Sequence, residues 1–218
     1  MTVVYPPTAV IPAALSQAVG EMPAWFVIGG HAVRCFCPYR PSRDVDFGVR
    51  TTADLHGLLE RLAATGSLDV LERSVDTVHA RWNGVPVSVF VVPQLAPFVE
   101  DRRLSVTGIL ATKVHAIVDR GTRRDFFDLY VTMQTHGVGI AECLAAVREV
   151  YQTQVKESLL LRALTYFRDA EREAALPGEG AGDFERVKDY LMTRVGNLLV
   201  PPMAPLEIQK RQVDVTKS

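Results

Sequence analysis

The spacing of apolar residues changes part-way along the chain. In the first half, short apolar runs end at turn residues, which predicts strands over 25–28, 44–49, 68–72, 77–82 and 85–92. The dipeptide Asn83-Gly84 separates the last two runs and predicts a two-residue hairpin. Between the strands, apolar residues at helical spacing predict helices over 8–20, 31–37 and 51–65.

After Pro93 the apolar residues follow a helical period almost throughout. This pattern predicts helices over 107–120, 124–136, 139–152, 156–174 and 184–199. Strands followed by helices, without a regular βαβ alternation, indicate an α+β fold with a mixed sheet and flanking helices. We expect an α/β core over 1–100, a helical domain over 101–200 and an extended tail over 201–218.

Composition sets limits on the class of protein. The 218 residues are 48% hydrophobic and 22% charged, which is typical of soluble globular proteins. The formal net charge is −1, so a polyanion site would need local clustering of basic residues. No apolar run approaches the roughly 18 residues of a membrane span, and the three cysteines suit a reducing compartment. We therefore expect a cytoplasmic protein without a signal peptide or a membrane partner.

Asp44 and Asp46 interrupt an apolar run that otherwise predicts a buried strand. Side chains at positions i and i+2 of a strand face the same way, so we expect these carboxylates to lie together. Neighbouring carboxylates raise each other's pKa unless a cation lies between them. Their oxygen atoms suit Mg²⁺, or Mn²⁺, which binds one or two carboxylates together with substrate phosphates. The pair is therefore a candidate metal site.

A glycine pair, Gly29-Gly30, ends the strand that precedes this one. A glycine turn lets backbone N–H groups approach a phosphate, and the start of the next helix adds a favourable dipole. The loop that follows supplies hydroxyl and guanidinium groups from Arg40, Ser42 and Arg43. Each feature alone is more often a plain turn or a solvated strand end. Their order along the chain favours a phosphate and metal site.

Two blocks of sequence resemble a known family. The run GGHAVRCFCPYRPSRDVDF resembles the signature of the polymerase-β-type nucleotidyltransferase superfamily, in which Asp-x-Asp follows a glycine pair. The run ATKVHAIVDRGTRRDFFDLY, residues 111–130, is similar to a block of the AbiEii/AbiGii-type toxin nucleotidyltransferases. The resemblance covers about residues 25–135. It implies a nucleotidyltransferase-like fold whose helical half completes the active site.

The second block also has a physical interpretation of its own. Lys113 and Arg120 are seven residues apart and share one helix face, while Asp125 and Asp128 are neighbours on the next helix. Such a surface can bind a triphosphate, with one aspartate orienting Lys113 or an acceptor hydroxyl. The alternative is an ordinary salt-bridge cluster between two helices.

The resemblance implies attack by an acceptor hydroxyl on the α-phosphate of a nucleoside triphosphate, with pyrophosphate as the leaving group. Mg²⁺ or Mn²⁺ is the implied cofactor, and Asp44 and Asp46 are its expected ligands. The candidate catalytic residues are Asp44, Asp46, Lys113, Asp125 and Asp128. The candidate nucleotide-binding residues are Gly29, Gly30, His31, Arg40, Ser42, Arg43, Lys113 and Arg120. A structural role at the helix start is an equal alternative for His31.

One position departs from the family pattern. Polymerase-β-type enzymes commonly carry a third carboxylate on a later strand, and alternation along VPVSVFVV places Ser88 at that position. Serine cannot serve as a carboxylate ligand or base. The acid then comes from Asp128, Asp125 or Glu100, or this branch works with an altered set of residues, or the protein is an inactive relative.

The acceptor and the partners also follow from the resemblance. It implies a toxin of a toxin–antitoxin or phage-defence system that modifies an RNA end, such as that of tRNA, with an antitoxin as a partner. Local charge favours RNA, because residues 102–124 contain Arg102, Arg103, Lys113, Arg120, Arg123 and Arg124. The alternatives are the same chemistry on a small-molecule or protein hydroxyl, and a degenerate binding module of the same fold.

Overall fold

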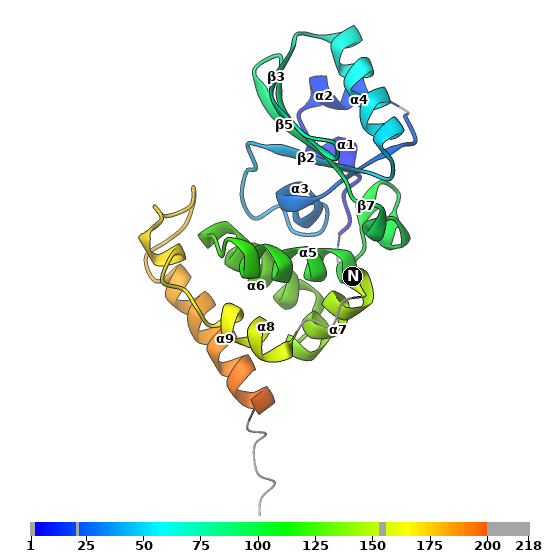
Figure 1. Cartoon of the computed structure of the whole chain (residues 1–218). Coiled ribbons are helices and arrows are strands. Elements are labelled where there is room, and N and C mark those ends of the chain that lie inside the picture. The colour runs from blue at the N-terminus through cyan, green and yellow to red at the C-terminus, as the bar shows by residue number, and fades with distance from the viewer. Residues whose placement is uncertain (1–2, 21, 153–155, 200–218) are drawn as a thin grey trace, which may run out of the picture.

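The computed structural model describes residues 3–20, 22–152 and 156–199. The described residues form one seven-stranded mixed sheet with flanking helices, followed by a helical half (Figure 1). The α+β prediction is therefore confirmed. The predicted tail over 201–218 lies outside the described residues, and the predicted division near residue 100 stays a prediction.

The sheet has the strand order β3-β4-β5-β2-β1-β7-β6. The strands are β1 (Trp25–Val27), β2 (Val45–Val49), β3 (Leu68–Arg73), β4 (Thr77–Trp82), β5 (Val85–Val91), β6 (Val99–Glu100) and β7 (Arg103–Leu104). Strand β2 is antiparallel to β1 and parallel to β5, while β3, β4 and β5 form an antiparallel meander. The two short strands β6 and β7 were not predicted, and β7 extends the sheet by pairing parallel to β1.

Helices cover the sheet and then build the second half of the chain. The α-helices are α1 (Pro7–Val10), α2 (Ala13–Val19), α3 (Gly29–Arg34), α4 (Thr52–Thr65), α5 (Val106–Asp119), α6 (Arg123–His136), α7 (Ile140–Tyr151), α8 (Glu157–Leu164) and α9 (Asp183–Leu199). Short 3-10 helices are η1 (Pro93–Phe98) and η2 (Ala170–Arg172). No helix among the described residues is both long enough and apolar enough to cross a membrane.

Three helix predictions need correction. The predicted helix over 8–20 is two helices, because Pro12 lacks the N–H that a continuous helix needs there. The helix predicted over 156–174 ends at Leu164, and only the short η2 follows within that range. The helix predicted over 31–37 begins two residues earlier, at Gly29, so the glycine pair belongs to the helix start.

Local sequence signals explain the elements that were predicted well. Thr51 and Asp54 form a reciprocal capping box at the start of α4, which satisfies two backbone N–H groups that would otherwise lack partners. Asn83 and Gly84 both have positive φ angles, 48° and 81°, as a tight hairpin turn between twisted strands requires.

One face of the sheet is packed against α2 and α4. Alternate strand residues such as Phe47 and Val89 point into this cluster, where they meet Leu15 of α2 and Leu58 of α4. The residues between them in the strands, including Asp46 and Ser88, therefore face the other side of the sheet. The sequence alternation thus fixes which side chains are available to a functional site.

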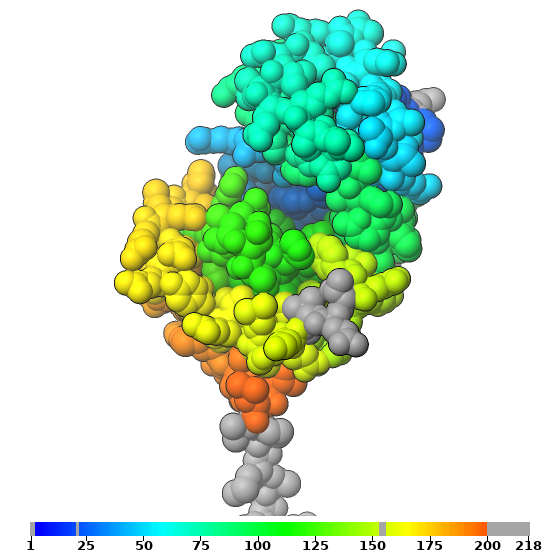
Figure 2. All heavy atoms as spheres, in the orientation of Figure 1, coloured from blue at the N-terminus to red at the C-terminus, as the bar shows by residue number. Residues whose placement is uncertain are grey.

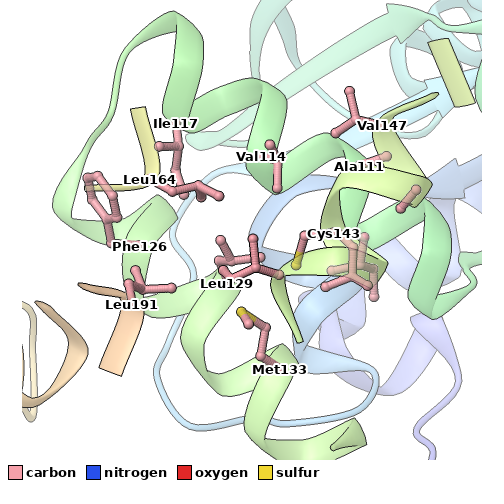
Figure 3. Close-up of a cluster of buried hydrophobic side chains, with 14 of the residues drawn as sticks. Ala111, Val114, Ile117, Phe126, Leu129, Met133, Cys143, Val147, Leu164 and Leu191 are labelled. Carbon is pink, nitrogen blue, oxygen red and sulfur yellow. The ribbon is translucent and has the colours of Figure 1, made fainter. Parts of the chain in front are cut away.

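The second hydrophobic cluster holds the helical half together around α5, which contacts α6, α7 and α8. Figure 3 shows Val114 of α5, Leu129 of α6 and Cys143 of α7 pointing toward one another in this cluster. Helix α3 contacts β2 as well as α5 and α6. It therefore links the sheet to the helices and places the glycine turn between them.

Candidate active site

A cleft of about 340 Å³ lies between the polar face of the sheet and helices α5 and α6. Figure 2 shows a recess between the upper part of the molecule and the green helices below it. Most of the predicted site residues line this cleft. They are Gly29, Gly30, Arg40, Ser42, Asp44, Asp46, Lys113, Arg120, Asp125 and Asp128. Segments that are far apart in the sequence therefore meet at one surface.

The glycine turn is shaped by its contacts with the neighbouring strand and loop. Gly29 has a φ angle of +60°, and a Cβ atom there would lie 2.4 Å from Oδ2 of Asp46. A Cβ atom on Gly30 would lie 2.8 Å from the Ser42 hydroxyl oxygen. Only glycine accepts both the backbone conformation and the close approach at position 29. The backbone of the turn therefore lies directly against the Asp46 carboxylate.

Asp44 and Asp46 both face the cleft but lie in different surroundings. Strand β2 begins at Val45, so Asp44 precedes the strand rather than lying within it, and its side chain is 49% exposed. Its Oδ2 lies 3.6 Å from a guanidinium nitrogen of Arg124. Burial raises the pKa of Asp46 to about 6; Lys113 opposes this shift and the charge of Asp44 adds to it.

The carboxylate oxygens of Asp44 and Asp46 fit a divalent cation whose remaining ligands come from a substrate. Among the described residues, no group of three or more His, Cys, Asp and Glu side chains is arranged to hold a metal ion alone. Burial raises the pKa of Asp46, and the charges of Lys113, Arg120 and Arg124 offset this effect only in part. Mg²⁺ commonly binds one or two carboxylates together with phosphate oxygens. Asp44 and Asp46 therefore have the chemistry of such a site.

Lys113 lies on the opposite wall, held by two aspartates of α6. Its Nζ atom lies 2.6 Å from Oδ2 of Asp128 and 3.5 Å from Oδ1 of Asp125. The Lys113 side chain is only 5% exposed, and each aspartate side chain is 1% exposed. Because the lysine is fixed by two buried partners, its ammonium group has a defined position beside the cleft.

Asp128 also accepts hydrogen bonds from two residues of the loop between α3 and β2, Tyr39 and Arg40. Arg40 donates to both carboxylate oxygens, at 2.9 and 3.0 Å, and the Tyr39 hydroxyl donates to Oδ1 at 2.6 Å. Burial, then the charge of Asp128, raises the pKa of Tyr39, so the phenol stays protonated and donates. Asp128 therefore ties the loop between α3 and β2 to Lys113.

Asp125 is satisfied by a second set of donors. Arg120 donates to both of its oxygens, at 2.9 and 3.1 Å, and the Thr122 hydroxyl donates at 2.5 Å. Burial alone would raise the pKa of Asp125, but the hydrogen bond from Arg120 and the charge of Lys113 lower it to about 2. Asp125 thus remains ionised and fully paired.

Some predicted residues do not reach the cleft. His31 is 1% exposed and does not line it; burial, then the charge of Arg34, lowers the pKa of His31 to about 4. Arg43 lines an adjoining groove instead. Glu100 is exposed on β6, the last strand at the far edge of the sheet from β3.

Ser88 occupies the position at which the third carboxylate was expected. In the parallel pairing of β2 and β5, Asp46 is registered with Ser88, and both line the cleft. In the next pairing, Ser88 is registered with His79 of β4, and the two side chains are joined by a hydrogen bond of 2.9 Å. Asp46, Ser88 and His79 therefore form a row across three strands.

His79, Phe90 and Arg124 line the cleft but were not predicted as site residues. The signal for His79 was present, because a hairpin turn at Asn83-Gly84 places residue 79 opposite residue 88. Arg124 lies in the basic segment noted above, yet its contact with Asp44 depends on how α6 packs near the loop before β2. No sequence pattern pointed to Phe90 as a cleft residue.

Two further recesses open from the cleft. One, of about 500 Å³, shares Gly29, Asp46 and Lys113 with it. It is also lined by Tyr151 and His115, whose ring centroids lie 4.8 Å apart. The other, of about 440 Å³, shares residues with the cleft on the Arg124 side and is lined by Arg40, Arg43, Asp44, Arg124 and the segment 175–177. The first is partly aromatic, and the second is basic.

Comparison with known proteins identifies the family. The sequence model of the family "Nucleotidyl transferase AbiEii toxin, Type IV TA system" matches residues 84–196, which is more than half of the 218 residues. The chain belongs to the AbiEii nucleotidyltransferase toxin family. It is also 27% identical over 160 residues to the uncharacterized protein aq_aa25 of Aquifex aeolicus (strain VF5), covering 68% of this chain and 76% of that protein.

One solved structure supports the assignment of the fold. A candidate nucleotidyltransferase from H. pylori has a TM-score of 0.55 at 15% identity, covering 84% of this AbiEii chain and 89% of its own. The antibiotic-resistance factor ANT(2'')-Ia has a TM-score of 0.49 at 12% identity, covering 64% and 89% respectively. Family and fold together make this chain a nucleotidyltransferase.

Proposed function

We propose that this protein is a metal-dependent toxin that transfers a nucleotide from a nucleoside triphosphate to an RNA end, that of tRNA. One observation supports this reaction above all. The glycine turn, the Asp44–Asp46 pair and the buried Lys113 line a single cleft, although they come from distant parts of the chain. Phosphate-binding groups and carboxylates are thus brought together at the place where a nucleotide with its cation would bind.

The triphosphate would be held by groups that the protein has already positioned. Backbone N–H groups at Gly29 and Gly30 are free of side-chain obstruction, because neither residue has a Cβ atom. Lys113, fixed by Asp125 and Asp128, supplies a positive charge that needs no rearrangement when the phosphates bind. Arg120 adds a second charge at the rim of the cleft, where its side chain is 55% exposed.

Asp44 and Asp46 would hold Mg²⁺ or Mn²⁺. When bound, this ion would polarise the phosphate and neutralise developing negative charge. Because Asp46 lies directly against Gly29, an ion held by these carboxylates would lie beside the glycine turn. Asp125 and Asp128 serve a different purpose in this proposal: they position Lys113 and the Arg40 loop.

The basic groove beside Asp44 supports an RNA acceptor. Arg43 and Arg124 both line it, and Arg124 also lines the main cleft, so a phosphate backbone in the groove would lead an RNA end to Asp44. The basic cluster in the sequence does not form one surface, however. Arg102 lies against the Trp25 ring at 4.9 Å, and Arg123 pairs with Glu179. Fewer cations thus face the cleft than the sequence suggested.

The biological setting is proposed from the family. A type IV toxin–antitoxin system implies an antitoxin encoded with the toxin. A nucleoside triphosphate and tRNA as substrates place the reaction in the cytoplasm. The partly aromatic recess lined by Tyr151 and His115 would receive the nucleoside part of the triphosphate.

A labelling assay tests the proposed function. The protein is incubated with Mg²⁺ and each α-³²P-labelled nucleoside triphosphate, and the acceptors offered are total tRNA, total protein and small hydroxyl compounds. We expect label in tRNA, and none when Asp44→Asn and Asp46→Asn are combined. Label in protein or small molecules instead would contradict the RNA acceptor. Labelling of none of the three would contradict the enzymatic function and favour a binding module.

A further inference from the structure

The proposed function raises the question of which group accepts the proton of the attacking hydroxyl. Of the carboxylates that line the cleft, Asp44 and Asp46 are assigned to the metal. Asp128 accepts hydrogen bonds from Arg40 and Tyr39 and is paired with Lys113. Asp125 is likewise paired, with Arg120 and Lys113. Taking a proton would cost these buried aspartates their ion pairs, so they are poor acceptors.

His79 is the remaining basic group on the cleft wall that is not paired with a charge. Its Nδ1 atom lies 2.9 Å from Oγ of Ser88. Its ring packs against Phe90 in a T-shaped arrangement, with 5.7 Å between ring centroids and an interplanar angle of 78°. The side chain is half-buried, so its other ring nitrogen can exchange protons with solvent. Position and chemistry both suit a proton acceptor.

Ser88 connects His79 to the candidate metal site. It is registered with Asp46 on one side and with His79 on the other. Neighbouring strands lie about 4.8 Å apart, so Ser88 is one strand spacing from Asp46, whereas His79 is two. An acceptor hydroxyl bound near Asp46 is therefore within reach of the serine hydroxyl, and the serine hydroxyl is already hydrogen-bonded to the imidazole.

We propose that Ser88 and His79 together replace the missing third carboxylate as the proton acceptor for the attacking hydroxyl. Ser88 touches the acceptor and is the catalytic residue of the pair. His79 acts through Ser88.

The proton and electron movements of this step balance. The acceptor oxygen forms a bond to the α-phosphorus while its proton passes to Oγ of Ser88. The proton of the serine hydroxyl passes in turn to Nδ1 of His79, which becomes an imidazolium. The bond between the α-phosphorus and the bridging oxygen breaks, and its electron pair leaves with pyrophosphate. His79 then returns its proton to solvent, and Ser88 ends as a neutral hydroxyl.

The charged groups that face His79 come from each neighbouring element. Glu72 of β3 is registered with His79 of β4. Arg81 lies two residues beyond His79 along β4, on the same face of the sheet. On the other side, beyond Ser88, lies Asp46 of β2. Arg120 and Arg124 line the same cleft from the helical half. Charges of both signs therefore surround the imidazole.

The test is the pH dependence of nucleotide transfer under single-turnover conditions, at saturating Mg²⁺ and nucleoside triphosphate. The variants are Ser88→Ala, His79→Gln and the two combined, with His56→Gln as the control because His56 is exposed on α4, away from the cleft. We expect each single variant to lose about 10²- to 10⁴-fold in rate at neutral pH. The double variant should lose no more than either, because the two residues act as one unit.

Three further readouts separate proton transfer from a structural role. Equilibrium binding of the triphosphate with Mg²⁺ should be unchanged in His79→Gln, and that variant should lose an acidic limb of the pH–rate profile that His56→Gln keeps. Ser88→Asp combined with His79→Gln should regain most of the lost rate, because a carboxylate accepts the proton directly. If single variants keep the wild-type rate and profile, or if Ser88→Asp fails to rescue, the inference is wrong. Wild-type protein that labels no acceptor overturns the proposed function itself.

Discussion

The cleft contains two pairs of aspartates whose electrostatic surroundings are opposite. Asp125 and Asp128 are buried among cations and hydroxyl groups, and the pKa of Asp125 lies near 2. Asp44 has a half-exposed ion pair with Arg124, and burial raises the pKa of Asp46 to about 6 despite the opposing charge of Lys113. The first pair joins α6 to Lys113 and to the Arg40 loop. We propose that the second pair is available to bind a cation.

The largest effect is expected at the available pair. Asp46→Asn removes a proposed metal ligand, and loss of several kcal/mol of charge stabilisation corresponds to a decrease of about 10³-fold in transfer rate. The unfolding free energy should stay the same or rise, because an uncompensated buried charge is removed. Activity is measured by α-³²P transfer, and stability by urea unfolding. If Asp46→Asn is inactive because it is unfolded, the proposed difference between the two aspartate pairs is wrong.

The next largest effect is expected at the paired aspartates. Asp128→Asn leaves Lys113 and Arg40 buried without their shared carboxylate, which should lower the unfolding free energy by roughly 3–5 kcal/mol. Asp44→Asn is the matched control, since its exposed ion pair with Arg124 should contribute less than about 1 kcal/mol. Equal destabilisation by the two substitutions would show that the pairs do not differ as described.

The pH dependence of stability should have opposite signs for the two pairs. The pKa of Asp46 is raised from 3.8 to about 6, so the native state binds the extra proton, and stability falls as pH rises through this range, by about 3 kcal/mol. The pKa of Asp125 is lowered from 3.8 to about 2, so its contribution of about 2 kcal/mol is present above pH 3.8 and lost as pH falls toward 2.

These signs are measured with single variants in metal-free buffer containing EDTA. The difference in unfolding free energy between wild type and Asp46→Asn should change between pH 4 and pH 6, with wild type becoming relatively less stable as pH rises. The difference between wild type and Asp125→Asn should change only below about pH 4. Slopes of the same sign for both variants would contradict the assignment.

A smaller effect is expected at the glycine turn. Gly29→Ala places a Cβ atom against Asp46 and forces a non-glycine residue to φ +60°, which should cost about 1–3 kcal/mol. Gly57→Ala is the matched control, because this half-buried α4 position has nothing within 4 Å of the new Cβ atom. That control should gain about 0.5–1 kcal/mol through helix propensity. Urea unfolding of the two variants measures the difference in sign.

The sequence alone places Asp44 and Asp46 close to the glycine turn, but it does not reveal the surroundings of Asp125 and Asp128. Asp44, Asp46 and the glycine turn lie within 20 residues, and period-2 alternation predicts which face Asp46 occupies. The contacts of Asp128 with Tyr39 and Arg40 join residues 89 and 88 positions apart, and no local pattern predicts them. Whether an Asp-x-x-Asp helix is a metal site or an ion-pair cluster depends on such long-range packing.

Strands and helices, too, were predicted correctly where a local sequence signal marks them. The capping box at Thr51 and the hairpin at Asn83-Gly84 are local signals, and both gave correct elements. Strands β6 and β7 have two residues each, too few for an alternating pattern. Helix α8 ends at Leu164, within a segment whose composition remains helical, so the sequence pattern did not reveal this boundary.

The position of the cation tests the contrast most directly. Crystals grown with Mn²⁺ and a non-hydrolysable nucleoside triphosphate would locate the metal by its anomalous scattering. We predict a peak bound by carboxylate oxygens of Asp44 and Asp46 and by the triphosphate, with Asp125 and Asp128 still paired to Lys113. A peak bound by Asp125 or Asp128, with Lys113 displaced, would contradict the central claim that the two aspartate pairs have different roles.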